Sequence, residues 1–520
     1  MALRIRFIEP APPGHHVYDH AMLPRLGTPL MGAVLADAGH DVRCYCEVIA
    51  PVDVADCLSA DLVGISSTTS TQPAAYQLAE EFDAAGVPVV LGGPHVTFLA
   101  DEGLDHAGFV VRGEGQRTIA ELAEALERGR PLEQIPGLSW RDPSGQRHHN
   151  PDRLRCSQHE FEALPAPGLS LIAGNEQMAI KPVMTQWGCP FDCEFCSVTA
   201  MFSRRVRHRR NVHVLAEIAA LDAKRVFFHD DNFVVDKRRT GELLRSMVDT
   251  GLTPDWFAQV RAETVYATRS AREPDHDFLA LMKAAGCQMV MIGFESTSDR
   301  SLVQMNKKMQ VRDIVESVRL FHDHGILVHG MFVAGADTDD AGQAGRTVDF
   351  ARRHGIDTIQ IMIETPLPGT RLFERARADG RILTTDWSLY DGHHAVMRPM
   401  LTHPRELQLT VFDAMSRFYS RRAIALPGIA AAFRNAPALA RLASRGELAR
   451  RFPALARLAA LRRWHELRET LKSAMPRADW ARLQQDFAVP ALRAYGRGQV
   501  AKWWAQDRSQ AHLAFLAALS

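Results

Sequence analysis

The chain has 520 residues, 46% of them hydrophobic and 23% charged, and its 61 lysines and arginines equal its 61 aspartates and glutamates. This composition excludes an intrinsically disordered chain, a collagen-like repeat and a small disulfide-stapled scaffold. The formal net charge of zero provides no bulk attraction to nucleic acid, so we expect no nucleic-acid partner. At about 150 residues per domain, the length predicts three to four domains.

The amino-terminal residues and the cysteine content predict a cytoplasmic protein. The opening MALRIRFIEPAPPG is too short and too charged for a secretory signal, and no stretch of about 18 apolar residues predicts a membrane span. Eight cysteines are few for this length. In a reducing compartment, clustered cysteines serve metal binding or catalysis rather than disulfide formation.

Residues 1–129 are predicted to alternate between strands and helices. The predicted strands are 4–10, 41–49, 61–69, 87–93 and 109–113, and the predicted helices are 26–40, 71–86 and 114–129. Strands separated by helices of this length form a parallel, doubly wound (Rossmann-like) α/β sheet. Ligands bind such sheets at the carboxyl ends of the strands.

Small and hydroxyl residues occupy these predicted strand ends. They are Ser66–Thr69, the Gly92-Gly93-Pro94-His95 turn, and Gly113–Gly115 with Glu114 between the two glycines. Such residues let a ligand approach the backbone. No Gly-x-Gly-x-x-Gly follows the first strand, so a dinucleotide is not favoured.

The GGPH turn, followed by VVRGEG, resembles the cobalamin-binding domain that precedes some radical enzymes. The resemblance implies cobalamin contacts from Ser66, Thr68, Gly92, Gly93, His95, Gly113, Glu114 and Gly115. Several such domains use Asp-x-His-x-x-Gly to place a histidine below the cobalt. Here Asp391-Gly392-His393 lies outside the domain and has Val396 where glycine is needed. The resemblance is therefore to members without that histidine, and a domain of the same fold that binds no corrinoid is the alternative.

Three cysteines follow a proline-rich segment at 131–182. Cys189, Cys193 and Cys196 have the spacing C-x3-C-x2-C. Thiolates hold iron–sulfur clusters, and three of them leave one iron of a four-iron cluster open to a small chelating molecule. A zinc site would need a fourth ligand nearby. A redox C-x-x-C pair would leave Cys189 unexplained.

The three-cysteine pattern resembles the radical S-adenosylmethionine (SAM) superfamily. The resemblance implies a 4Fe-4S cluster on Cys189, Cys193 and Cys196, with SAM bound to the open iron and Phe195 against its adenine. One electron, from a donor of the flavodoxin or ferredoxin type, then cleaves SAM to a 5′-deoxyadenosyl radical. We expect the other five cysteines to be small buried residues; they are Cys44, Cys46, Cys57, Cys156 and Cys287.

Strands with helical stretches between them continue after the cluster motif. They are predicted at 227–235, 256–264, 289–297, 327–340 and 358–370, and one more precedes Cys189. Six such units predict a partial (β/α) barrel with its site at the strand ends. The family resemblance implies SAM contacts from Asp230, Asp231, Asn232, Gly293, Glu295, Ser296 and Gly335, with Pro366–Thr370 closing the last loop.

The segment after the barrel offers catalytic candidates. Tyr390 and His393, with Asp391 and His394, either reach the substrate pocket or form a solvated loop, and Arg261 is a further candidate. From Arg421 to Ser520, 18 basic residues stand against 6 acidic ones. Leucine and alanine at helical spacing predict amphipathic helices there. These helices lie on an anionic membrane surface or pack their arginine stems on the barrel, and Trp503 and Trp504 suit either setting.

The predicted domains are a cobalamin-binding-like domain at 1–145, a linker at 146–180, a radical SAM barrel at 181–385 and a basic helical region at 386–520. The resemblance implies cobalamin-dependent methylation of an unactivated carbon in a small molecule or lipid. A radical cyclase, oxygenase, ring-contracting or carbon–carbon coupling enzyme is the first alternative. A corrinoid or cluster-based sensor or electron carrier is the second.

Overall fold

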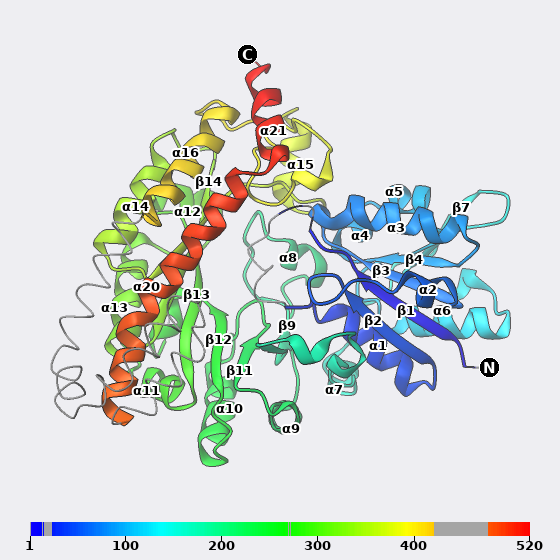
Figure 1. Ribbon diagram of the computed structural model, residues 1–520, viewed down its shortest axis with the longest axis horizontal. Coiled ribbons are helices and arrows are strands. Elements are labelled where there is room, and N and C mark those ends of the chain that lie inside the picture. The colour runs from blue at the N-terminus through cyan, green and yellow to red at the C-terminus, as the bar shows by residue number, and fades with distance from the viewer. Residues whose placement is uncertain are drawn as a thin grey trace, which may run out of the picture. The chain divides into compact units, whose positions relative to one another are not determined.

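The computed structural model describes residues 2–12, 14, 23–268, 270, 272–420 and 477–519. The chain forms two compact units, which are Met1–Val411 with Ala505–Ser520, and Phe412–Trp504. The first unit contains two separate parallel sheets, which appear in Figure 1 as a blue and cyan layer and a green layer.

The first sheet has seven strands in the order β2-β1-β3-β4-β5-β6-β7. Its parallel strands are β1 (Arg4–Glu9), β2 (Asp41–Cys46), β3 (Leu62–Ser66), β4 (Val89–Gly92) and β5 (Phe109–Val111). Its helices are α1 (Gly27–Asp37), α2 (Val54–Leu58), α3 (Gln72–Ala84), α4 (Pro94–Phe98), α5 (Ala100–His106) and α6 (Gln116–Arg128). The predicted doubly wound domain is confirmed.

Alternating strand positions build a core on each face of this sheet, because successive side chains of a strand point to opposite faces. Phe7 packs with Leu35 of α1 and Leu122 of α6. The next residue, Ile8, packs on the other face with Phe82 of α3.

Two antiparallel strands extend the sheet into the range predicted as a proline-rich segment. They are β6 (Leu138–Arg141) and β7 (Arg147–His149), and the short helix α7 (Gln158–Glu162) follows them. The sequences LSWR and RHH are too short and too polar to stand out as strands. The domain boundaries drawn from the sequence stay a prediction.

The second sheet has six parallel strands in the order β8-β11-β12-β13-β14-β15. They are β8 (Lys181–Val183), β11 (Arg225–Phe228), β12 (Asp255–Val260), β13 (Cys287–Glu295), β14 (Leu327–Ala334) and β15 (Thr358–Ile363). The intervening helices are α9 (Asn211–Leu221), α10 (Lys237–Asp249), α11 (His276–Ala284), α12 (Asp299–Gln304), α13 (Val311–Asp323) and α14 (Gln343–Arg353), and α15 (Arg371–Ala378) follows the last strand. Strands and helices alternate throughout, which confirms the predicted partial barrel.

A small hairpin and one helix carry the chain between β8 and β11. Strands β9 (Gln186–Trp187) and β10 (Arg207–His208) pair in antiparallel fashion, and α8 (Ser197–Phe202) lies between them in sequence. All three predicted cluster cysteines lie between β9 and α8, so this hairpin frames the cysteine loop.

The described part of the carboxyl-terminal region contains helices, as predicted. Its described helices are α16 (Pro404–Phe418), α20 (Arg477–Trp504) and α21 (Asp507–Ala517). In the first unit, Ser509 of α21 lies 3.1 Å from Nε2 of the buried His394. No described helix is both long enough and apolar enough to cross a membrane. Most of the basic segment predicted to be amphipathic, residues 421–476, lies outside the described residues.

A buried ion pair joins the first sheet domain to the barrel. Arg207 of β10 places Nη1 2.6 Å from Oε1 of Glu114, which follows β5, and both side chains are only 4% exposed. The same Nη1 lies 3.2 Å from the carbonyl oxygen of Cys156. The guanidinium also packs near the rings of Phe161, Trp187 and Phe202. The Arg207 charge among these aromatic rings is stable only with Glu114 as its counter-ion, because neither charged group is in contact with water.

We therefore expect Arg207→Ala to lower the free energy of unfolding by about 3–5 kcal/mol, since it leaves the Glu114 carboxylate buried without its counter-ion. Urea unfolding followed by circular dichroism measures the change. Arg117→Ala is the matched control, because Arg117 forms an exposed ion pair with Glu160 and should leave the midpoint nearly unchanged. Equal midpoints for the two variants would contradict a structural role for the buried pair.

Candidate functional site

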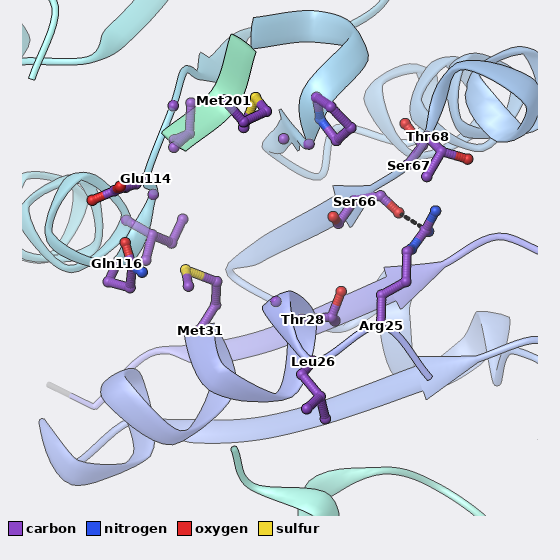
Figure 2. A pocket seen from close by; sticks show the side chains of 18 of the residues that line it. Arg25, Leu26, Thr28, Met31, Ser66, Ser67, Thr68, Glu114, Gln116 and Met201 are labelled. Carbon is purple, nitrogen blue, oxygen red and sulfur yellow. Dashed lines mark hydrogen bonds between the residues drawn. The ribbon is translucent and has the colours of Figure 1, made fainter. Parts of the chain in front are cut away.

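A cavity of about 390 Å³ opens at the carboxyl ends of the first sheet. One wall consists of the ends of β3 and β4, the loop after β5, and the first turns of α1 and α6. The other wall consists of residues on both sides of the cysteine loop, among them Trp187 and Met201, together with His229 and Asp231 after β11. Figure 2 shows Met31 of α1 and Met201 of α8 pointing into this space. Both sheets therefore present their carboxyl ends to one cavity.

The cavity gathers most of the residues predicted to contact cobalamin. They are Ser66, Thr68, Gly92, Gly93, Gly113, Glu114 and Gly115. Gly93 has φ +106°, and a Cβ there would lie 2.2 Å from the carbonyl oxygen of Ser67. Glycine is therefore required at this turn, where the backbone borders the cavity.

His95 is the predicted cobalamin residue that does not line the cavity. Its side chain is fully buried, with Nε2 3.3 Å from Oε1 of Glu102. The same Glu102 oxygen accepts a hydrogen bond of 2.8 Å from Nε1 of Trp387. His95 thus contributes to packing between the first domain and the segment after the barrel.

Glu114 borders the cavity, but its carboxylate is already engaged. Oε2 accepts a 2.8 Å hydrogen bond from the backbone of Cys156 and a 2.7 Å bond from Arg207. Glu114 therefore helps to position the cavity wall through its ion pair with Arg207.

The deep end of the cavity is an apolar crevice between the sheet, α1 and α6. Phe7, Val111 and Ile119 line it together with Met31. At Gly64, also in the lining, a Cβ would approach the Phe7 ring to 2.5 Å. Sequence reasoning missed Met31 and Ile119, because a helix residue facing a cavity has the same spacing as one facing a core.

An arginine is fixed at the mouth of the cavity. Both oxygens of the buried Glu9 accept hydrogen bonds from the backbone N–H of Arg25. Nη2 of Arg25 donates to the carbonyl oxygen of Ser66 at 2.9 Å, the dashed line in Figure 2. Sequence reasoning did not select Arg25, because the contact that orients it comes from a different strand.

Three observations indicate that cobalamin fits this cavity. Glycines and hydroxyl residues leave the strand ends open, the crevice offers apolar walls for a nucleotide base, and the lining reaches the cysteine loop. Among the described residues of the first domain that line the cavity, none is a histidine.

The three cysteines lie in one loop and are unbonded. Gly188, immediately before Cys189, has φ +85°, and a Cβ there would lie 2.2 Å from the carbonyl oxygen of Arg205. The loop therefore begins at a position that requires glycine. Burial raises the pKa of Cys189 and that of Cys196, the latter to about 11, so cluster binding must displace their protons.

The residues of the loop suit a four-iron cluster, which binds each thiolate at a separate corner. Among the described residues, no group of three or more His, Cys, Asp or Glu side chains could hold a single metal ion. The three cysteines would hold the cluster, and their assignment as its ligands stays a prediction.

Asp230 and Asp231 are adjacent in sequence but differ in their contacts. Asp230 accepts hydrogen bonds from the backbone of Thr185 at 2.8 Å, from the Thr185 hydroxyl at 2.6 Å and from the backbone of Gln186 at 3.1 Å. Asp231 is exposed and lines the cavity. The backbone of Asn232, the third predicted residue here, accepts a hydrogen bond from the Gln186 side chain. Asp230 therefore anchors the strand that enters the cysteine loop, whereas Asp231 has its carboxylate at the cavity.

The residues at the end of β13 form a tight turn beside the loop. Glu295 has φ +60° and pairs with Nζ of Lys307 at 2.5 Å. A Cβ at Gly293 would lie 2.5 Å from the Glu295 carboxylate, so the Glu295 side chain would have to shift to accommodate it. Ser296 is buried and accepts a 3.1 Å hydrogen bond from the backbone of Ser298.

Arg261 ties this turn to the cysteine loop. Its Nη2 donates to the carbonyl oxygen of Lys307 at 2.7 Å, and its guanidinium lies 3.7 Å from the centre of the Phe191 ring. Nε also pairs with Glu263 at 2.7 Å. These contacts orient the loop, and a catalytic role for Arg261 stays a prediction.

The remaining predicted residues lie in other packing environments. Phe195 packs against Leu372 and Met397, and Gly335, at φ +97°, approaches Leu407. The Tyr390 hydroxyl donates to the carbonyl oxygen of Thr384 at 2.7 Å, and the backbone of His393 donates to Asp391. Neither Tyr390 nor His393 lines the cavity, so their catalytic roles stay predictions.

Comparisons with known proteins match the first sheet domain and the barrel to two protein families. Residues 21–123 match the family model of the B12 binding domain, and residues 183–344 match that of the Radical SAM superfamily. An uncharacterized methyltransferase of Pyrococcus horikoshii is 31% identical over 425 residues, which cover 78% of this chain and 90% of that protein. The bacteriochlorophyllide d C-12(1)-methyltransferase of Chlorobaculum tepidum is 28% identical over 378 residues, 71% of this chain and 77% of that protein.

A solved structure shows the same fold. The radical S-adenosylmethionine methyltransferase TsrM from Kitasatospora setae, with cobalamin and an iron–sulfur cluster bound, has a TM-score of 0.60 at 18% identity over 74% of this chain and 76% of that chain. Together with the relative from Pyrococcus, these matches show to which family the chain belongs. The chain belongs to the cobalamin-binding radical S-adenosylmethionine enzymes, whose cofactors are a 4Fe-4S cluster, S-adenosylmethionine and cobalamin.

Proposed function

We propose that this enzyme methylates an unactivated carbon of a small-molecule or lipid substrate. One observation carries the proposal: a single cavity is lined by the strand ends of the B12-type domain and by residues flanking the cysteine loop of the barrel. Methyl transfer to a carbon radical requires the radical source and the methyl donor to act on one substrate, and proximity of this kind lowers the barrier. Two cofactor sites that share a cavity meet that requirement.

The bound cofactors supply a 5′-deoxyadenosyl radical and a transferable methyl group, and the chain's residues bind and position them. Cys189, Cys193 and Cys196 would hold the cluster, and Asp231 would accept hydrogen bonds from the ammonium group of SAM. Gly92 and Gly93 would let the corrin approach the strand ends.

The two relatives described above support methylation, whereas an anaerobic magnesium-protoporphyrin IX monomethyl ester cyclase of Rubrivivax gelatinosus, 26% identical over 387 residues, supports the cyclase alternative. The first two are named methyltransferases, and both align over more than two thirds of this chain.

A methyl-labelling experiment tests the proposed function without knowledge of the substrate. The anaerobically reconstituted protein is incubated with reductant and SAM that carries an isotopic label in its methyl group. We expect label in the cobalamin fraction and, separately, formation of 5′-deoxyadenosine. A cyclase or coupling enzyme would form 5′-deoxyadenosine and leave the cobalamin unlabelled.

The Cys193→Ala variant is the control for the radical step. It should abolish 5′-deoxyadenosine, because the cluster loses one of its three thiolates, whereas Cys57→Ala, far away in α2, should retain it. Undiminished cleavage of SAM by Cys193→Ala would refute the assignment of the cluster.

Gly92 provides a direct test of the cobalamin site. A Cβ at this position would meet nothing closer than a carbonyl oxygen at 4.0 Å, and the residue lines the cavity. Gly92→Val should therefore fold normally but fill part of the cofactor space, so cobalamin is lost on desalting.

The visible spectrum of the desalted protein measures the retained cobalamin. Gly108→Val serves as control, because a Cβ at Gly108 also meets nothing within 4 Å and the residue does not line the cavity. Equal retention by both variants would place the corrinoid elsewhere.

Asp231 and Asp230 should respond differently to the same substitution. Asp231→Asn should raise the Kd of SAM roughly tenfold, because a charge-assisted hydrogen bond becomes a neutral one. Asp230→Asn should instead lower the free energy of unfolding by about 1–3 kcal/mol, since it disrupts the buried bonds to Thr185 and Gln186.

Isothermal titration of SAM into the cluster-loaded protein, with urea unfolding in parallel, separates the two effects. If Asp230→Asn weakened SAM binding and Asp231→Asn did not, the roles assigned here would be reversed.

A further inference from the structure

The cobalamin cavity has two walls, and a bound corrin ring has two faces. The first wall consists of the strand ends of the first domain, where Gly92 and Gly93 border the cavity. The second wall consists of barrel residues, among them Met201, His229 and Asp231. A planar ring that lies against the first wall therefore turns its other face, with one axial position of its cobalt, toward the barrel.

His229 is the only histidine among the described residues that line the cavity. It directly follows β11, and its backbone N–H donates to the carbonyl oxygen of Val183 at 2.8 Å, which continues the ladder with β8. Phe228, one residue earlier, is fully buried against the rings of Phe233 and Trp256. Since alternate side chains of a strand point to opposite faces, the partly exposed His229 points away from these rings.

The imidazole of His229 is neutral and lies within electrostatic reach of the first wall. Desolvation lowers its pKa, a hydrogen bond from the ring to the backbone of the same residue raises it, and the positive charge of Arg25 lowers it, with a net downward shift. Arg25 belongs to the first domain, and its Nη2 donates to the carbonyl oxygen of Ser66 at the end of β3. The charge that acts on His229 therefore comes from the opposite side of the cavity.

The ring nitrogens of His229 have the arrangement that a metal ligand needs. A neutral imidazole is the commonest metal ligand in proteins. A metal-binding histidine usually donates from its other ring nitrogen to a carbonyl or carboxylate, which fixes the tautomer. The hydrogen bond from the His229 ring to its own backbone meets that requirement. The second ring nitrogen is left as an acceptor, and no other described residue forms a hydrogen bond with the ring.

We propose that His229 is an axial ligand of the cobalt of bound cobalamin, which it binds from the barrel side when SAM and substrate are absent. Among the described lining residues, the first domain contributes no histidine, so the imidazole would come from the barrel instead. A nitrogen at this position closes the barrel-facing side of the cobalt to water. The inference goes beyond the proposed function, because it concerns the cofactor before any methyl group is transferred.

Electron paramagnetic resonance of cob(II)alamin tests the proposal without a measurement of activity. An axial nitrogen splits each cobalt line into three if it is nitrogen-14 and into two if it is nitrogen-15, because the two nuclei differ in spin. The protein is produced with nitrogen-15 histidine, loaded with the cluster and with unlabelled cobalamin, and treated with a mild reductant. The cluster then stays oxidised and silent, and neither SAM nor substrate is added.

We expect doublets from the labelled protein and triplets from the unlabelled protein, because the ligating nitrogen belongs to a histidine. Triplets from the labelled protein would show that the cobalamin's own base, which carries unlabelled nitrogen, is the ligand. Unsplit lines would show that no nitrogen is bound. Either of these two results would overturn the proposal, and neither depends on the folding of a variant.

The His229→Ala variant identifies the histidine. In the labelled variant the doublets should disappear, and added unlabelled imidazole should produce triplets, because it occupies the emptied axial position. His213→Ala is the matched control, since His213 is exposed on α9 and does not line the cavity, and it should keep the doublets with or without imidazole. Doublets that persist in His229→Ala would assign the ligand to another histidine and overturn the proposal.

The failure of this inference is distinguishable from the failure of the proposed function. The splitting is measured on the resting protein without SAM, whereas methyl labelling and 5′-deoxyadenosine are measured on the reduced protein with SAM. Methyl labelling together with unsplit cobalt lines would overturn only the axial ligand. Doublets without methyl labelling would overturn only the methylation.

Discussion

The buried ion pair between Arg207 and Glu114 is the interaction on which the cavity depends. It joins the loop after β5 of the first sheet to the hairpin that frames the cysteine loop. Two parallel sheets each bring their ligand-binding residues to the carboxyl ends of their strands. A reaction that uses the ligand-binding residues of both sheets requires the carboxyl edges of the two sheets to stay at a fixed separation. A buried charge pair among aromatic rings contributes to this, because separating the two charges while they remain buried is strongly unfavourable.

Several residues near the cavity act by positioning others. Glu9 holds Arg25, Asp230 holds the strand that enters the cysteine loop, and Arg261 holds the loop against the turn after β13. Each is buried and polar, and each has its hydrogen-bonding groups occupied by a neighbouring segment. A reactive intermediate can be directed to one carbon only if the groups around it are rigid, and these contacts provide that rigidity.

The sequence by itself determined the fold class, the position of the three cysteines in one loop and most of the strand-end residues that line the cavity. Those features depend on local patterns: alternating elements, the C-x3-C-x2-C spacing, and glycines where the backbone must turn, as at Gly93. The tertiary structure alone distinguished Asp230 from Asp231, placed His95 in packing outside the cavity lining, and placed Met31 at the cavity. Spacing along a chain shows which residues share a face, but contacts between distant strands decide whether that face meets a cavity, a neighbour or a ligand. For the same reason, the Arg207–Glu114 pair, which joins residues 93 positions apart, could only be found in the folded chain.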